Sequence, residues 1–196
     1  MNIFSQFKLI SYQLLRPLSY LRIQHDDKWI YDWLLPLVLT AVTCGVVYVF
    51  IPIDKVVGTG GLISEITAFV ANLPGFFIAA LAAVATFNKN DIDQLMANPP
   101  KIEILHHGSS LMIEMTRRRF LCVLFSYLTA VSIFLVLASR LCLSMEISSE
   151  YFYFASYAGV IAFMFVLWQM ILATVLGLYY LGERLHTPLW QDSCHC

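Results

Sequence analysis

Long apolar segments alternate with short polar connections along the whole chain. A hydrocarbon core about 30 Å thick needs roughly 20 helical residues to cross it. Four apolar segments meet this length, and they predict transmembrane helices at residues 33–53, 66–87, 120–139 and 151–182. The last segment is longer than a span requires, so we expect it to tilt or to project from the bilayer. The pattern therefore predicts an all-α, polytopic membrane protein with a single domain.

The composition supports this class and excludes an ordinary soluble domain. Hydrophobic residues make up 59% of the chain and charged residues 13%, and the mean hydropathy is +0.72. Soluble domains have roughly 45–50% apolar and about 25% charged residues. The five cysteines have no regular spacing, which is typical of reduced thiols and not of a disulfide framework.

Positive charge is confined largely to every second connection. Ten of the twelve Lys and Arg residues lie in segments 1–32, 88–119 and 183–196, whereas the other connections carry only Lys55 and Arg140. Cytoplasmic connections of membrane proteins are enriched in Lys and Arg. The bias predicts a multi-pass protein of the plasma membrane whose two termini and whose insert at 88–119 are cytoplasmic.

The N-terminal segment 1–32 combines apolar and basic residues in a pattern typical of an amphipathic helix at the membrane surface. A cytoplasmic helix that packs on its own protein or on a neighbour would have the same pattern. A second basic group lies just before the third span. The residues that we expect at the membrane surface are Phe4, Phe7, Lys8, Arg16, Arg22, Arg117, Arg118 and Arg119.

The insert at 88–119 is the only sizeable polar element between two spans, so it is a candidate docking site for a soluble partner. Its polar and apolar residues alternate at 101–105, which predicts a short strand, and a turn follows at 106–108. Ser109 or Ser110 is expected to cap a helix that continues into the third span. The candidate partner-binding residues are Lys101, Glu103, His106 and His107.

Small residues recur at every fourth position of the second span, at Ala71, Gly75, Ala79 and Ala83. Such a row lets another helix approach closely in lipid. The helix that packs there is either another span of this chain or a span of a second copy. Because the connection at 54–61 is short, we expect the first and second spans to be antiparallel neighbours.

The spans contain few polar side chains. Ser126, Thr129 and Ser132 lie about one turn apart in the third span, where they either line a water path or bond to their own helix. Gln169 is the deepest strongly polar side chain in the fourth span. No ionisable residue lies near the middle of a predicted span, and this argues against a pump or an ion-coupled transporter.

The sequence has no catalytic signature such as HExxH, GxSxG or a phosphate-binding glycine loop. His106-His107 and the closing Cys194-His195-Cys196 have spacings that suit a tetrahedral zinc site poorly. We therefore expect a protein that is not an enzyme and that binds neither a metal nor a cofactor.

The whole layout resembles the KwaA family, the small membrane subunits of the bacterial Kiwa anti-phage system. The likeness rests on the length, the basic amphipathic start from Phe4 to Arg22, the four spans with both termini inside, and the cytoplasmic insert around Pro99 to His107. The resemblance implies a homo-oligomer in the bacterial inner membrane that works with KwaB, a cytoplasmic DNA-binding partner, and it implies no catalytic residues.

These patterns lead to one hypothesis and one alternative. The hypothesis is a non-enzymatic inner-membrane scaffold and sensor that oligomerises and recruits a cytoplasmic effector in anti-phage defence, without binding nucleic acid itself. The alternative is an oligomeric pore or channel that depolarises the cell.

Overall fold

The computed structural model describes residues 16–22, 29–58, 60–86, 101–106, 109–114, 116–144 and 152–182. Within them, four helical segments are long and apolar enough to cross a membrane: Ile30–Phe50, Ile53–Thr86, Arg117–Ser144 and Tyr153–Gly182. The prediction of an all-α polytopic membrane protein with four spans is confirmed. The predicted N-terminal amphipathic helix is described only in its last part, where the short 3-10 helix η1 (Arg16–Arg22) lies.

The first span begins with a single π-helical turn, η2 (Ile30–Leu34), and continues as α2 (Leu35–Phe50). Proline has no backbone N–H, so Pro36 cannot donate the usual helical hydrogen bond to the carbonyl of Asp32. The helix is wider in this turn than an α-helix. The N–H of Leu35 donates to the carbonyl of Ile30, five residues earlier, and not to the carbonyl four residues earlier. The first span therefore starts at Ile30, three residues earlier than the start at residue 33 that the sequence pattern predicts.

The second span consists of two helices, α4 (Leu62–Val70) and α5 (Leu73–Thr86), with a break at Ala71 and Asn72. Pro74 cannot donate to the carbonyl of Val70, which favours a break at this position. The Asn72 side chain partly replaces the missing bonds, because its Nδ2 donates to the carbonyl of Ala68 at 3.1 Å.

The connection before α4 contains the short helix α3 (Ile53–Val57) and a tight turn. Gly60 has φ +74°, a conformation that favours glycine. A Cβ atom on Gly61 would lie 2.7 Å from the carbonyl oxygen of Lys55, so only glycine fits there as well. These two glycines permit a tight turn, which directs the chain from α3 into α4.

The third and fourth spans are α6 (Arg117–Ser144) and α7 (Phe152–Gly182). Before α6 the chain forms an antiparallel hairpin of β1 (Lys101–His106) and β2 (Ser109–Glu114). The predicted strand at 101–105 is confirmed, but the predicted helix from Ser109 or Ser110 is wrong. The register pairs Ile102 with Ile113 and Ile104 with Leu111.

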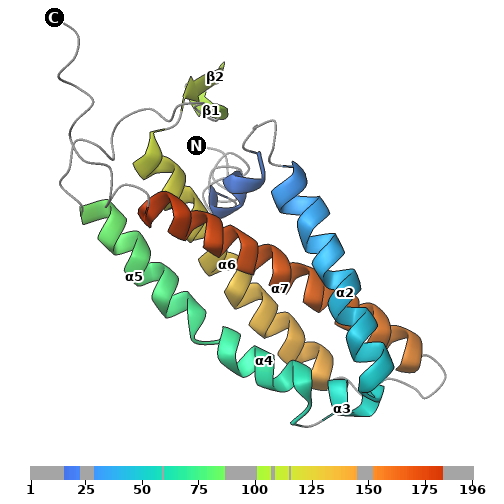
Figure 1. Cartoon of the computed structure of the whole chain (residues 1–196). Helices are drawn as coiled ribbons and strands as arrows, with labels where there is room; N and C mark the ends of the chain where they lie inside the picture. The colour runs from blue at the N-terminus through green and yellow to red at the C-terminus, as the bar shows by residue number, and fades with distance from the viewer. Residues whose placement is uncertain are drawn as a thin grey trace, which may run out of the picture.

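The spans pack in the order α4–α5, α6, α7, α2 across the bundle (Figure 1). The first span therefore packs chiefly on the fourth, and the second span packs chiefly on α6. The expectation that the first two spans are neighbours is wrong. The two spans are separated because the short helix α3 lies between them in the sequence and contacts both α7 and α4. The connection therefore passes across the end of α7 before α4 begins.

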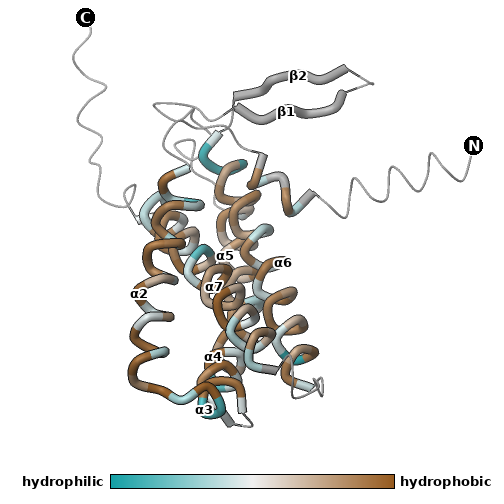
Figure 2. Tube along the Cα trace, turned by 90° about the vertical axis from the view of Figure 1, so that its right-hand side faces the viewer, coloured by the Kyte–Doolittle hydropathy of each residue, from teal (hydrophilic) through white to brown (hydrophobic). Residues whose placement is uncertain are grey.

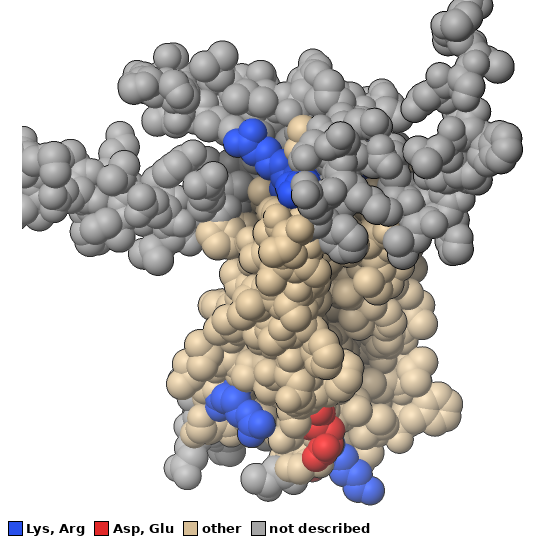
Figure 3. Space-filling model, turned by 90° about the vertical axis from the view of Figure 1, so that its left-hand side faces the viewer, with Lys and Arg blue, Asp and Glu red and all other residues tan. Residues whose placement is uncertain are grey.

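All four spans expose apolar side chains on their outer surfaces, and Figure 2 shows the apolar residues along their whole length. Phe50 and Phe154 are 77% and 80% exposed, which suits a surface that contacts lipid and not water. On the face in Figure 3, charged side chains lie at the two ends of the bundle and leave an uncharged band between them. The end with the hairpin is called the hairpin end here, and the opposite end the α3 end.

Candidate functional site

Four side chains with polar groups meet inside the bundle near the hairpin end: Tyr20 of η1, Asp32 of η2, Tyr127 of α6 and Gln169 of α7. We call them the aspartate cluster. Each comes from a different element, so the cluster connects η1 and three of the four spans.

Asp32 is the central residue of the cluster. Its side chain is 5% exposed, and its Oδ1 accepts a hydrogen bond of 3.1 Å from the hydroxyl of Tyr20, which is 2% exposed. A carboxyl group is costly to bury unless donors surround it. The hydroxyl of Tyr20 provides such a donor and thereby holds η1 against the start of the first span.

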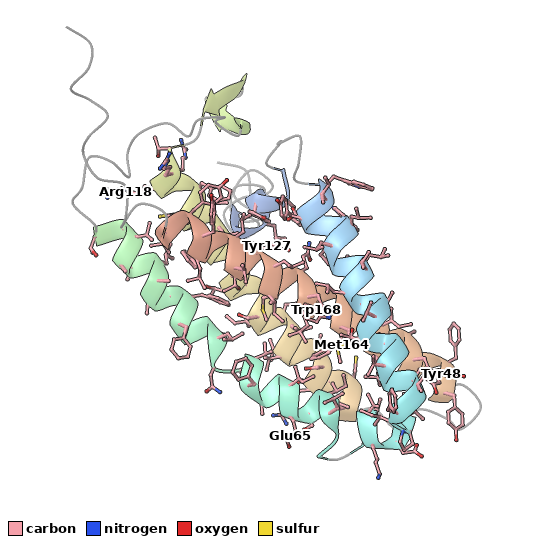
Figure 4. The ribbon with its side chains drawn as sticks, in the orientation of Figure 1. Tyr48, Glu65, Arg118, Tyr127, Met164 and Trp168 are labelled. Carbon is pink, nitrogen blue, oxygen red and sulfur yellow. The ribbon has the colours of Figure 1, made fainter. Side chains whose placement is uncertain are left out.

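The ring of Tyr20 packs between two aromatic rings of α6. It stacks on Tyr127 with ring centroids 4.8 Å apart, and the ring of Phe120 lies 6.4 Å away. Tyr127 lies on α6 where η1 crosses it (Figure 4). Burial, and then the nearby charge of Asp32, raise the pKa of Tyr20 well above its ordinary value. Its hydroxyl therefore remains a proton donor across the physiological pH range.

Gln169 completes the cluster from α7. Its Nε2 donates to the backbone carbonyl of Asp32 at 3.5 Å, and its side chain is 9% exposed. This carbonyl is the one that Pro36 cannot serve. Gln169 therefore compensates for a proline in a neighbouring helix, and it fixes the position of α2 relative to α7.

Two further interhelical bonds lie deeper in the bundle. The indole Nε1 of Trp168 donates to the hydroxyl of Thr43 at 3.2 Å where α7 passes α2 (Figure 4). The hydroxyl of Thr67 in α4 donates to that of Ser139 in α6 at 3.1 Å, and both side chains are buried. Together with Gln169, these bonds join spans that are neighbours in the bundle, the first to the fourth and the second to the third.

A groove of about 650 Å³ runs between α2 and α7. Small side chains form much of its wall, including Ala41, Ala158 and Ala162. Thr40 also lines it; its side chain is 5% exposed, and its hydroxyl has no hydrogen-bond partner among the described residues. Ring pairs flank the groove, Trp33 with Phe165 at 6.0 Å and Tyr48 with Tyr157 at 6.2 Å.

The row of small residues in the second span, Ala71, Gly75, Ala79 and Ala83, is exposed at all four positions. We call it the small-residue face. A Cβ atom on Gly75 would meet no other atom within 4 Å. The face therefore does not pack on another described span of the same chain.

The predicted membrane-surface residues of α6 lie in its first turn at the hairpin end, where Arg117, Arg118 and Arg119 are half-buried. The Nη1 of Arg118 donates to the carbonyl of Ala85 at 3.3 Å, near the C-terminus of α5, where a positive charge is favourable. Arg16 and Arg22 are the first and last residues of η1, and Phe4, Phe7 and Lys8 lie outside the described residues.

The candidate partner-binding residues Lys101, Glu103 and His106 belong to β1, of which the structure describes the backbone. In the hairpin register Lys101 pairs with Glu114. His107 lies outside the described residues.

The hydroxyl groups of the third span bond within their own helix. Thr129 donates to the carbonyl of Phe125 at 2.8 Å, and Ser132 donates to that of Thr129 at 2.9 Å. These bonds match the simpler of the two interpretations drawn from the sequence. Among the described residues, no three His, Cys, Asp or Glu side chains are grouped so that they could hold a metal ion.

Sequence reasoning missed Asp32 and Tyr20. Asp32 directly precedes the first span predicted at residues 33–53, and apolar and aromatic residues surround it on both sides. That setting, with Pro36 four residues later, is a signal that could have identified it, because an ionisable residue within an apolar run often marks a functional site. Tyr20 gave no comparable signal in the sequence.

The fold and the cluster define a class, a multi-pass all-α membrane protein with a polar cluster inside its helical bundle. Comparison of the chain with family models, with curated proteins and with solved structures finds no match.

Proposed function

We propose that the protein is a non-enzymatic membrane scaffold and sensor, which self-associates in the bilayer and recruits a soluble effector at its hairpin end. The observation that carries this proposal is the buried bond between Tyr20 and Asp32. It joins a segment outside the spans to η2, the first turn of the first span, so a change in the packing of that span on α7 would move η1.

The arrangement of the spans supports the sensing role. In the most apolar part of the first span 11% of the residues are buried, compared with 44% in α6. Between lipid-bathed helices there is little hydrophobic drive for association, so packing and a few polar bonds hold a span in place. A disturbance of the bilayer therefore acts most easily on α2, the span with the smallest buried surface.

Self-association is supported by the exposed small-residue face. Rows of this kind permit close helix packing in lipid. The recruiting role is supported by the gathering of η1, the hairpin and the basic first turn of α6 at one end of the bundle, the end that the charge bias assigns to the cytoplasm (Figure 1). The resemblance to the KwaA family extends the proposal to anti-phage defence, with a cytoplasmic DNA-binding protein as the effector.

The test is co-purification of the chain, from gently solubilised bacterial membranes, with a cytoplasmic DNA-binding protein encoded by a neighbouring gene. We expect stoichiometric recovery with the unmodified chain and reduced recovery with Lys101→Glu in β1. The matched control is Lys55→Glu in α3, the same charge reversal at the opposite end, and it should leave recovery unchanged. Failure to recover the partner with the unmodified chain, or equal losses in both variants, would refute recruitment at the hairpin end. Conductance of the purified chain in liposomes would instead support the pore.

A further inference from the structure

We propose that the pocket which Tyr20 fills on the bundle is the docking site for a tyrosine of the soluble effector, and that η1 competes with the effector for it. This inference rests on the proposed recruitment at the hairpin end, and it names the site and the chemistry of the partner segment. η1 is then an internal competitor, which leaves the pocket when the effector binds.

The first argument is the aromatic wall of the pocket. The ring of Tyr20 stacks on Tyr127 with centroids 4.8 Å apart, and the ring of Phe120 lies 6.4 Å away at an interplanar angle of 51°. Tyr180 of α7 packs edge-on against Phe120 at 5.4 Å. Stacked and tilted ring pairs of this kind favour an aromatic occupant. The wall belongs to α6 and α7, so the pocket is a feature of the bundle and not of η1.

The second argument is the acceptor at the tip of the ring. Oδ1 of Asp32, a side chain that is 5% exposed, accepts the hydroxyl of Tyr20 at 3.1 Å. A buried carboxyl group favours an occupant that brings a donor. Phenylalanine fills the same space without a donor, and lysine brings a donor without a ring that stacks on Tyr127. The pocket therefore selects a ring with a hydroxyl at its tip, which is the side chain of tyrosine.

The third argument is how η1 is held. Its described side chains are those of Pro17, Leu18, Tyr20 and Leu21, and of these only Tyr20 is buried. Leu18 and Leu21 are 38% and 49% exposed. A 3-10 helix has poorer hydrogen-bond geometry than an α-helix, so η1 gains little from its own backbone. Among the described side chains, the docking of η1 therefore rests on one ring and one hydroxyl, and a second tyrosine can replace them.

The fourth argument is the position of the pocket at the hairpin end. η1, in dark blue in Figure 1, lies outside the four spans and reaches the pocket from this end. Asp32 is the third residue of the first span and Phe120 the fourth residue of α6. With a rise of about 1.5 Å per residue, both lie within about 5 Å of the start of their helices. A segment of a soluble partner at the same end can therefore enter where η1 enters.

Binding of a labelled peptide provides the direct test. The probe is RPLSYLR, the sequence of η1, added to the full chain in micelles of a neutral detergent. In the unmodified chain Tyr20 occupies the pocket, whereas in Tyr20→Ala the pocket is empty. We expect the peptide to bind Tyr20→Ala at least about tenfold more tightly, because the tethered competitor is removed. The matched control is Tyr48→Ala, which removes an exposed tyrosine near the other end of α2 and should leave the affinity unchanged.

A second peptide, RPLSFLR, tests the role of the hydroxyl because it keeps the ring and lacks the donor. We expect it to bind Tyr20→Ala about three- to tenfold more weakly than RPLSYLR does. When Asp32→Ala is added to Tyr20→Ala, the acceptor is removed and this difference should vanish.

Tyr20→Phe keeps the ring of η1 and is the milder variant if Tyr20→Ala fails to fold. Its η1 competes less strongly than that of the unmodified chain, because the bond to Asp32 is lost. We expect RPLSYLR to bind this variant about three- to tenfold more tightly than it binds the unmodified chain.

The effector gives a further readout, since Tyr20→Ala should raise its recovery in the co-purification and Tyr48→Ala should leave its recovery unchanged. Three results would overturn the docking site while recruitment stands: equal binding of RPLSYLR to the unmodified chain and to both Tyr20 variants, equally tight binding of a peptide with lysine in place of the tyrosine, or a lower recovery of the effector with Tyr20→Ala. If the effector does not co-purify with the unmodified chain, the proposed function itself is overturned.

Discussion

Replacement of Tyr20 by phenylalanine tests whether the aspartate cluster stabilises the bundle. The substitution removes only the hydroxyl that donates to Asp32 at 3.1 Å and keeps the ring that stacks on Tyr127. A hydrogen bond to a charged group contributes about 1.5–3 kcal/mol, and a buried acceptor that loses its donor also loses solvation that water cannot restore. We expect the free energy of unfolding to fall by about 2 kcal/mol, or about 30-fold in the unfolding equilibrium.

The assay is reversible unfolding of the purified chain in mixed micelles, followed by tryptophan fluorescence. Trp168 is a suitable reporter because it bonds to α2 through Thr43. The matched control is Tyr31→Phe, which removes the hydroxyl of a tyrosine that lies beside Asp32 in the sequence and is 50% exposed. We expect the control to change stability by less than about 0.5 kcal/mol. Equal stabilities of the two variants would refute the assigned role of the buried bond.

The same variant gives a second readout through pH. The pKa of Tyr20 is raised in the folded chain, so the native state keeps a proton that the unfolded state releases above its ordinary pKa of about 10. The contribution of the bond is thus fully present below pH 10 and is lost as the pH rises beyond it. We expect the stability difference between the unmodified chain and Tyr20→Phe to narrow above about pH 10. A constant difference across this range would contradict the argument.

The same unfolding assay checks two further predictions. A Cβ atom on Gly177 would lie 2.9 Å from Cδ2 of Leu124, which is completely buried, so Gly177→Ala should cost about 1–3 kcal/mol. Gly159→Ala, whose Cβ atom meets open space within α7, should be neutral or slightly stabilising, because alanine favours a helix more than glycine does. Equal effects of the two substitutions would show that α6 and α7 do not approach so closely. Gln169→Leu should cost about 1 kcal/mol in the native sequence and less in a Pro36→Ala background, because the restored backbone N–H can serve the carbonyl of Asp32, and simple additivity of the two changes would disprove this compensation.

The sequence pattern located the four spans because their length and apolar composition are properties of each segment alone. It did not predict which spans are neighbours. In a soluble bundle the apolar stripe of a helix identifies its buried face, but in lipid the exposed face is equally apolar. The first span illustrates this, since α2 has no charged residue on either side and its exposed face is as apolar as the side that contacts α7.

The aspartate cluster could be predicted in part only. Gln169 was recognised as unusually deep, but its bond to the backbone carbonyl of Asp32 depends on how the first and fourth spans pack together. Tyr20 was not recognised at all, because its role depends on η1 crossing α6, a tertiary contact with no local signal. By contrast, the row of small residues can be read directly from the sequence, and the structure adds that all four positions are exposed, with Ala71 at the break between α4 and α5.

The position of α2 depends on few interactions, and they are unevenly distributed along its length. Near the hairpin end, Asp32 is bonded by both Tyr20 and Gln169, and near the middle Thr43 is bonded by Trp168. The apolar side chains of α2 are as stable against lipid as they are against α7, so apolar packing contributes little to holding α2 in place. These hydrogen bonds therefore contribute a larger part of the free energy that positions α2 than they would in water. Loss of the bonds to Asp32 would therefore free one end of α2 while α3 still holds the other. We expect the span to pivot about its end at α3, and the released end is the one that contacts η1 through Asp32 and Tyr20.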